Sequence, residues 1–256
     1  DLGIPKDKPF VCLYVRDDGF EKLRTSGGSS HSNADINNFR NVVLEIIERG
    51  YHVVRMGDPL MEPINFMHKN FINYIHTPQY NSLLDLYLYR HCSFWIGTGG
   101  GARFGPIFYK RPSIVVNDTE LHFSGSCLTR NDIVIFKHIF SVRDGRFLCL
   151  KEQLEQIQQI SVINPVSANY LFVENIPAEI SQVFLEWYED PSTQSFDWDN
   201  SLQEHYHNLR QKYVIDAYFN ADKNEWDNAT VEYHQHLRPR IGKQFLENCF
   251  EYGEYL

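Results

Sequence analysis

The residues best suited to chemistry form a glycine-rich run, Gly97 to Gly101, in the stretch FWIGTGGGARFG. Glycine lets the backbone approach a ligand closely, and free backbone amides where a helix begins bind phosphate oxygens. Three consecutive glycines, Gly99, Gly100 and Gly101, follow Thr98, and a tight turn does not need so many. We therefore interpret the run as a contact for phosphate or diphosphate. A turn that needs glycine only for its dihedral angles is the structural alternative.

Charged residues also stand where predicted strands end. Arg16 and Asp17 directly follow the apolar run FVCLYV, and YHVVR ends in Arg55, with Gly57 and Asp58 just beyond. Open α/β sheets bind ligands beyond the carboxyl ends of their strands. A guanidinium stays charged and offers paired donors, so Arg16 is a candidate phosphate ligand, and Asp58 is a candidate partner for a ribose or sugar hydroxyl. The structural alternative for each group is a surface ion pair or a turn.

Four further polar residues lie at or near the starts of predicted helices. Asn33 and Asp35 open a helical segment, and Asp35 is either a general base or the cap of that helix; the residues alone favour the cap. Ser82 and Asp85 lie on an amphipathic segment, SLLDLYLYR, that leads into the glycine run. For Asp85, a role as a charge partner on the helix competes with ligand contact.

The histidines do not indicate a metal site. The chain has eleven, including His205 with His207 and His234 with His236. Residues two positions apart on a helix point to different sides, so we expect these pairs to bind no metal. The chain has no Gly-x-Ser-x-Gly elbow and no Gly-Lys-Ser/Thr phosphate loop, so neither a covalent hydrolase nor a nucleotide triphosphatase of that type is supported.

Apolar runs that alternate with helical patterns predict the fold. The segment from Phe94 to Val116 contains a strand, the glycine turn, a helical stretch to Tyr109 and a second strand, which is a βαβ unit. We expect an α/β fold with a Rossmann-like, mostly parallel sheet in residues 1–180. Residues 181–256 are predicted to form a helical C-terminal extension packed on the same domain. A last short strand at YLFVE precedes a helix that Asn175 is expected to cap.

Composition restricts the partners and the compartment. The chain of 256 residues carries 33 acidic and 24 basic side chains, a net charge of −9, which argues against nucleic acid or an anionic membrane as the main partner. No apolar run reaches the ~20 residues of a membrane helix, so we expect no transmembrane segment. Five dispersed cysteines fit reduced thiols in a cytoplasmic protein. The chain lacks an initiator Met, so we interpret it as a fragment of a longer protein that has a further domain upstream.

Four blocks resemble a known family. VCLYVRDDGF, NADINNF, GYHVVRMGDP and SLLDLYLYRHCSFWIGTGGG occur in the same order as in a group of bacterial glycosyltransferases encoded with surface-polysaccharide genes. The resemblance covers about Phe10 to Asn117 and extends more faintly to the ENIPAEI segment. It departs at the glycine turn, where the family has Ile-Gly-Thr-Thr-Ser-Gly and this chain lacks those additional hydroxyls. The block order is also distantly similar to fucosyltransferases that use a GDP-sugar.

The resemblance implies a GT-B-like architecture, of which one Rossmann-like half is evident here, and it implies roles for individual residues. Arg16 would hold the donor diphosphate and stabilise the charge of the leaving nucleotide. Thr98 and the glycines after it would line the same phosphates, and Asp58 would lie near the nucleoside. Asp35 or Asp17 would be the base. Donor contacts are assigned to Asn33, Arg55, Gly57, Asp58, Ser82, Asp85, Gly97, Thr98, Gly99, Gly100 and Gly101.

The expected function is therefore transfer of a sugar from a nucleotide-sugar donor to a hydroxyl of a glycan or lipid-linked acceptor, in surface glycan synthesis. The nucleotide sugar is a substrate, and neither a metal nor another cofactor is expected. A non-catalytic nucleotide- or sugar-binding module is one alternative. A phosphate-recognising hydrolase or epimerase on a similar half-sheet is another, since fold alone does not choose between them.

Overall fold

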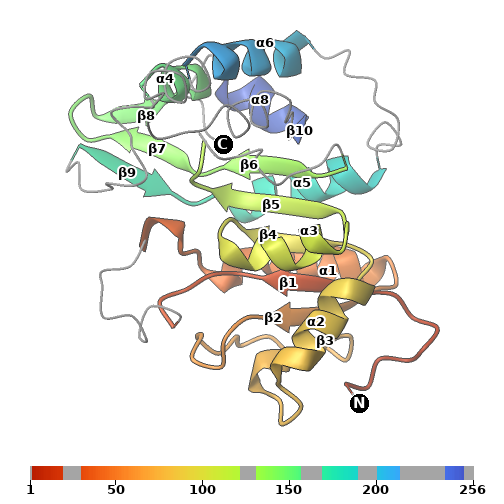
Figure 1. Cartoon of the computed structure of the whole chain (residues 1–256). Helices are drawn as coiled ribbons and strands as arrows, with labels where there is room; N and C mark the ends of the chain where they lie inside the picture. Colours follow the sequence, from red (N-terminus) through yellow and green to blue (C-terminus); the bar gives the residue numbers. More distant parts are fainter. Residues whose placement is uncertain are drawn as a thin grey trace, which may run out of the picture.

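A parallel sheet forms the centre of the protein (Figure 1), described here from a computed structural model. The residues that the structure describes are 2–19, 30–121, 131–156, 169–189, 201–213 and 240–250. The sheet has seven strands, all parallel, in the order β3-β2-β1-β4-β5-β6-β10. Their bounds in that order are Phe71–Ile72, His52–Met56, Phe10–Tyr14, Trp95–Thr98, Ser113–Asp118, Ile133–Phe136 and Arg240–Ile241.

The central strands are buried along almost their whole length. β2, β4, β5 and β6 have no exposed residue, and β1 is buried from its second residue onward. Layers that cover both faces of a parallel sheet bury both sides of each strand, which is why such strands appear in the sequence as continuous apolar runs. The predicted fold class, α/β with a Rossmann-like and mostly parallel sheet, is confirmed.

Helices cover the two faces of the sheet (Figure 1). α1 (Arg40–Glu48) turns an apolar side formed by Val42, Val43, Ile46 and Ile47 inward and packs against α5 (Pro177–Glu189) on one face. α2 (Ser82–His91) and α3 (Phe104–Phe108) contact each other on the opposite face. The short 3-10 helix η3 (Ile36–Phe39) leads into α1, so the helix expected near Asn33 begins later than predicted.

The order of the strands reverses between β1 and β4. From β1 the chain builds outward through β2 and β3, and it then returns to the other side of β1 to build β4, β5 and β6. Ligands of open α/β sheets bind at such a reversal, beyond the carboxyl ends of the strands. β1 and β4 are close there because Tyr14 pairs with Gly97, where an added Cβ would lie 2.0 Å from the Tyr14 carbonyl oxygen. No other residue type fits at this position.

A second sheet extends from the carboxyl end of β6 (Figure 1). It is antiparallel in the order β8 (Arg146–Leu148), β7 (His138–Ser141) and β9 (Tyr170–Val173). The strand expected at YLFVE therefore exists, but as an edge of this small sheet. Around it lie α4 (Leu150–Glu155), α6 (Ser201–Arg210) and α8 (Lys243–Cys249). The C-terminal residues also supply β10, a strand that the sequence pattern does not predict.

Asn175 does not cap α5, contrary to expectation. Its side-chain oxygen accepts a hydrogen bond from the Asn117 amide at 2.7 Å, and its amide group donates to the Phe136 carbonyl at 2.8 Å. The Asn117 side chain in turn accepts from the Asn175 backbone at 2.6 Å. The start of α5 is instead closed by Glu179, whose carboxylate accepts from the Ile176 amide. Asn175 therefore joins the ends of β5 and β6.

The cysteines that the structure describes form no disulfide, as expected from their dispersed positions in the sequence. Cys12, Cys92, Cys149 and Cys249 are free and buried, and Cys127 lies outside the described residues. Of the helices in the described part of the chain, none combines the length and hydrophobicity that crossing a bilayer requires. Trp198, Trp226 and the pair His234 and His236 also lie outside the described residues.

Candidate functional site

Arg16 and the glycine turn meet at the reversal of strand order. The Arg16 amide donates to the Thr98 hydroxyl at 3.1 Å, and the Arg16 carbonyl accepts from the Ala34 amide at 2.8 Å. An added Cβ on Gly100 would lie 3.9 Å from Arg16 Nη1, so the guanidinium lies beside the turn. The side chain is half-buried and its backbone is held on both sides. The chain thus positions a cation before any ligand arrives.

The turn itself is open at its tip. Gly99 is buried, Gly100 is half-buried with φ of 116°, and Gly101 is exposed. That positive φ favours glycine at position 100. The 3-10 helix η5 (Gly101–Arg103) and the five-residue α3 follow, so the helix that was expected to run to Tyr109 is short. A helix dipole contributes little here, and the individual amides of the turn are the available anion ligands.

Arg103 is a structural cation behind this turn. It is buried, and it donates to Asp118 at 3.1 Å and to Glu120 at 2.7 Å. Burial and the neighbouring Asp118 charge raise the pKa of the Glu120 carboxyl, while the charges of Arg103 and Arg16 oppose the rise. Glu120 therefore lies within the electrostatic reach of Arg16. A half-buried carboxyl with a raised pKa is the kind of group that accepts a proton in catalysis.

Two more basic groups face the same region. Lys137 follows β6, is almost fully buried, and donates from Nζ to the Asn33 carbonyl. Burial lowers the pKa of Lys137, and the nearby Glu174 partly opposes this. The pKa of His31 is lowered by burial and then by the positive charges of Arg16 and Lys137. The three basic side chains are therefore close enough to interact.

Asp17 and Arg55 form a structural pair. One Asp17 oxygen accepts from the Gly19 amide and the other from the Glu62 amide, each at 2.8 Å. The second oxygen also lies 3.7 Å from Nη2 of Arg55. Arg55 is fully buried, which lowers its pKa although Asp17 opposes the change. Asp17 thus holds two loops and balances a buried charge, an arrangement that competes with a role as base.

Asp35 caps a helix, which is the structural alternative to a role as general base. It is the N-cap of η3, and its carboxylate accepts at 2.8 Å from both the backbone and the side-chain nitrogen of Asn37. The side chain is exposed. Asn33 lies closer to the basic groups, since its side chain donates to Asp18 and its carbonyl accepts from Lys137. Asn33 therefore lies near the reversal point, while Asp35 serves the backbone.

The remaining predicted contacts gather beyond β2 and at the start of α2. Asp58 accepts from the Leu60 amide at 2.8 Å and shapes the turn after Gly57. Burial raises the pKa of Tyr80, and the charges of Asp85 and Asp58 raise it further, so both carboxylates lie near this ring. Asp85 stands in the first turn of α2, where a negative charge stabilises the helix. Ser82, at the first position of α2, is exposed.

The structure adds site residues that the sequence interpretation omitted. Asp118 and Glu120 end or follow β5, and Lys137 follows β6, just as Arg16 follows β1. Applying the same rule about strand ends to SIVVNDTE and DIVIFK gives all three as candidates. His31 carries no comparable signal, because it lies in the short 3-10 helix η2 (Ser30–Ser32) and not at the end of a strand.

Comparisons with known proteins give no relative. No family model, no curated protein and no solved structure matches the chain. What the site can do therefore rests on its geometry: a guanidinium beside open glycine amides at a strand-order reversal, with a carboxyl of raised pKa nearby.

Proposed function

We propose that the carboxyl ends of β1 and β4 hold the diphosphate of a nucleotide sugar. We further propose that the chain transfers the sugar to an acceptor hydroxyl. The observation that carries the proposal is the position of Arg16, at the reversal of strand order and beside Gly100. The ordered resemblance of four sequence blocks to glycosyltransferases supports the same reaction. A GT-B-like arrangement and a role in surface glycan synthesis are part of this proposal.

The chemistry would be a displacement at the anomeric carbon of the sugar. The acceptor oxygen forms the new bond as the bond to the diphosphate oxygen breaks, and the electron pair leaves with the nucleoside diphosphate. Arg16 and the amides of Gly100 and Gly101 would stabilise that departing charge, since preorganised donors cost no rearrangement during the reaction. Lys137 adds positive charge near the same point, whereas the lowered pKa of His31 favours its neutral imidazole.

Glu120 is the best candidate for the base that removes the acceptor proton. Its pKa is raised by burial and by Asp118, which improves its ability to take a proton near neutral pH. Asp17 and Asp35, the bases expected from the sequence, both hold backbone amides. Glu120→Gln would keep the shape and the contact with Arg103 but remove the base.

A second function, non-catalytic binding of a nucleotide sugar, is favoured by the same engagement of Asp17 and Asp35. The two functions separate in one assay, release of nucleoside diphosphate from the donor with and without an acceptor. Release that depends on Glu120 supports transfer. Binding of a nucleotide sugar without release of nucleoside diphosphate from any donor tested supports the binding module.

The experiment that tests the proposal is a thermal-shift and calorimetric screen against UDP-, GDP-, CMP- and dTDP-sugars. Arg16→Ala should weaken binding of the best donor by roughly 10- to 100-fold, because it removes a hydrogen-bonded charge worth about 1.5–3 kcal/mol. Arg90→Ala, on the exposed side of α2, is the matched control and should leave affinity unchanged. Binding that survives Arg16→Ala at full strength refutes the diphosphate assignment.

His31 gives a second readout that needs no turnover. Its pKa lies below the usual 6.5 because of burial and the nearby charges of Arg16 and Lys137. A bound diphosphate would offset those positive charges, so the pKa of His31 should rise when the ligand is present. An NMR titration of the imidazole with and without the nucleoside diphosphate measures the change. A pKa that stays constant at saturation places the ligand elsewhere.

A further inference from the structure

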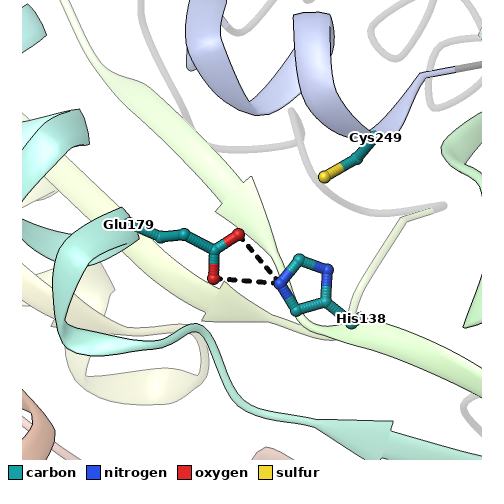
Figure 2. Close-up of side chains that lie close together, drawn as sticks. All are labelled: His138, Glu179 and Cys249. Carbon is teal, nitrogen blue, oxygen red and sulfur yellow. Dashed lines mark hydrogen bonds and ion pairs between the residues drawn. The ribbon is translucent and has the colours of Figure 1, made fainter. Parts of the chain in front are cut away.

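A second group of reactive side chains lies away from the glycine turn (Figure 2). His138 comes from β7, Glu179 from α5 and Cys249 from the end of α8. The imidazole Nε2 lies 2.9 and 3.0 Å from the two Glu179 oxygens, and the Cys249 sulfur points toward the pair. The exposed fraction is 4% for the His138 side chain and 13% for that of Glu179, and Cys249 is 2% exposed. Three elements therefore direct a nitrogen, an oxygen and a sulfur into one interior point.

The distances suit a small cation. One ligand atom from each residue lies within 4.8 Å of the other two. For any three points so spaced, some position lies within about 2.8 Å of all of them, whereas zinc bonds these atom types at about 2.0–2.3 Å. Each ligand then needs to move by less than about 1 Å, an adjustment that side-chain rotation can supply.

We propose that His138, Glu179 and Cys249 bind a divalent transition-metal ion of the zinc type. Imidazole, carboxylate and thiolate are the donor groups that zinc takes in proteins. One carboxylate and one thiolate also balance the two positive charges, so the occupied cluster is neutral in a buried environment. The site is separate from the proposed donor site and links the second sheet to α5 and α8, which gives it a structural role.

A cavity adjoins the Glu179 side of the cluster. A cavity of about 110 Å³ lies between α5 and α8, and Glu179 is one of its lining residues together with Ala178, Phe245 and Asn248. That volume admits water. Three protein ligands with water in the fourth position is a known zinc geometry, and the proposed site would take its fourth ligand from water in this cavity.

The competing description is a buried ion pair next to a core thiol. Burial, then the charges of Glu179 and Cys149, raise the pKa of Cys249 to about 12, so the metal-free thiol is protonated. His138 also packs on Phe245, with ring centroids 5.8 Å apart, and Glu179 closes the start of α5. These contacts account for the positions of His138 and Glu179 but do not require a sulfur atom at the third corner. The two descriptions therefore differ in whether the thiolate bonds a cation.

Cobalt(II) distinguishes them, because a thiolate bound to cobalt gives a charge-transfer absorption that carboxylate and imidazole ligands do not. The whole chain, stripped with a chelator, is titrated with Co²⁺. We expect one equivalent to produce the band and Zn²⁺ to displace it. Cys249→Ala should abolish the band, and Cys12→Ala, a buried thiol in β1, should retain it. A wild-type protein without the band, or a band that persists in Cys249→Ala, overturns the site.

A second variant keeps the test decisive if Cys249→Ala does not fold. Glu179→Gln retains the hydrogen-bonding shape at the start of α5 but loses the anionic ligand. Zinc affinity, measured by competition with a chromophoric chelator, should fall at least tenfold. Unchanged affinity refutes the three-ligand site. Neither measurement depends on nucleotide binding, so failure of the donor proposal and failure of the metal proposal are distinguishable.

Discussion

Asn175 is the side chain whose removal gives the sharpest prediction about how the fold holds the site. It is fully buried and lies 58 residues from Asn117 in sequence. The two asparagines exchange backbone and side-chain hydrogen bonds, and Asn175 also reaches the Phe136 carbonyl. The contact joins the end of β5 to the end of β6 and to the segment that leads into α5. Asn175→Ala removes the side chain and leaves the surrounding backbone in place.

The expected loss follows from the two side-chain hydrogen bonds. Without them, the Asn117 amide and the Phe136 carbonyl are both buried without a partner. Each unsatisfied group costs about 1–3 kcal/mol, so Asn175→Ala should reduce the free energy of unfolding by roughly 2–6 kcal/mol. Asn117 adds to this sensitivity because its φ of 53° is a strained backbone angle that asparagine tolerates better than most residues.

Equilibrium unfolding in urea measures the loss. Asn37→Ala is the control, since Asn37 is an exposed asparagine whose hydrogen bonds are made on the surface. It should change the free energy by less than about 1 kcal/mol. A cost of less than about 1 kcal/mol for Asn175→Ala, close to that of the control, would refute this role of Asn175, because two buried backbone groups would then have found other partners.

Two further predictions concern packing and acid sensitivity. Gly97→Ala should cost at least about 3 kcal/mol or prevent folding, because the new Cβ would lie 2.0 Å from the Tyr14 carbonyl; urea unfolding of soluble protein measures this. The Arg146 contact lowers the pKa of Glu152 from 4.5 to about 2, so this pair contributes stability above pH 4.5 and loses it as the pH falls towards 2. The stability advantage of the wild type over Glu152→Gln should shrink across that window, and an advantage independent of pH would contradict the assignment.

The sequence predicted those parts of the fold that burial determines. β1 and β5 are covered on both faces, so FVCLYV and SIVV appear as apolar runs in the sequence. The turn between β4 and α3 is recognisable from its glycines. β3 and β10 have two residues each and no pattern of their own. β3 and β10 are strands only because they pair with β2 and β6. That pairing depends on the tertiary structure and leaves no pattern in the local sequence.

The site was predictable to the extent that strand ends mark it. That rule gives Arg16 as a candidate, and its wider use would also have given Lys137. It could not separate ligand contacts from structural contacts, because Asp17 acquires its role from Arg55 and from a loop 45 residues later in the chain. The cluster of His138, Glu179 and Cys249 is harder still, since 41 residues separate the first two and no spacing motif links them.

The charges around the glycine turn bear on the ligand proposed for it. Arg103 is already matched by Asp118 and Glu120, so it adds little net positive potential for an anion. The feature that would select a ligand is therefore directional: Arg16 is fixed through its own backbone by Thr98 and Ala34 and lies beside the open amides of the turn. A compact anion that accepts several hydrogen bonds from one side gains most from such an arrangement, whereas a diffuse polyanion would meet the neighbouring carboxylates. The proposed diphosphate has that compact form, and the net charge of −9 would help to exclude larger polyanions from the same end of the sheet.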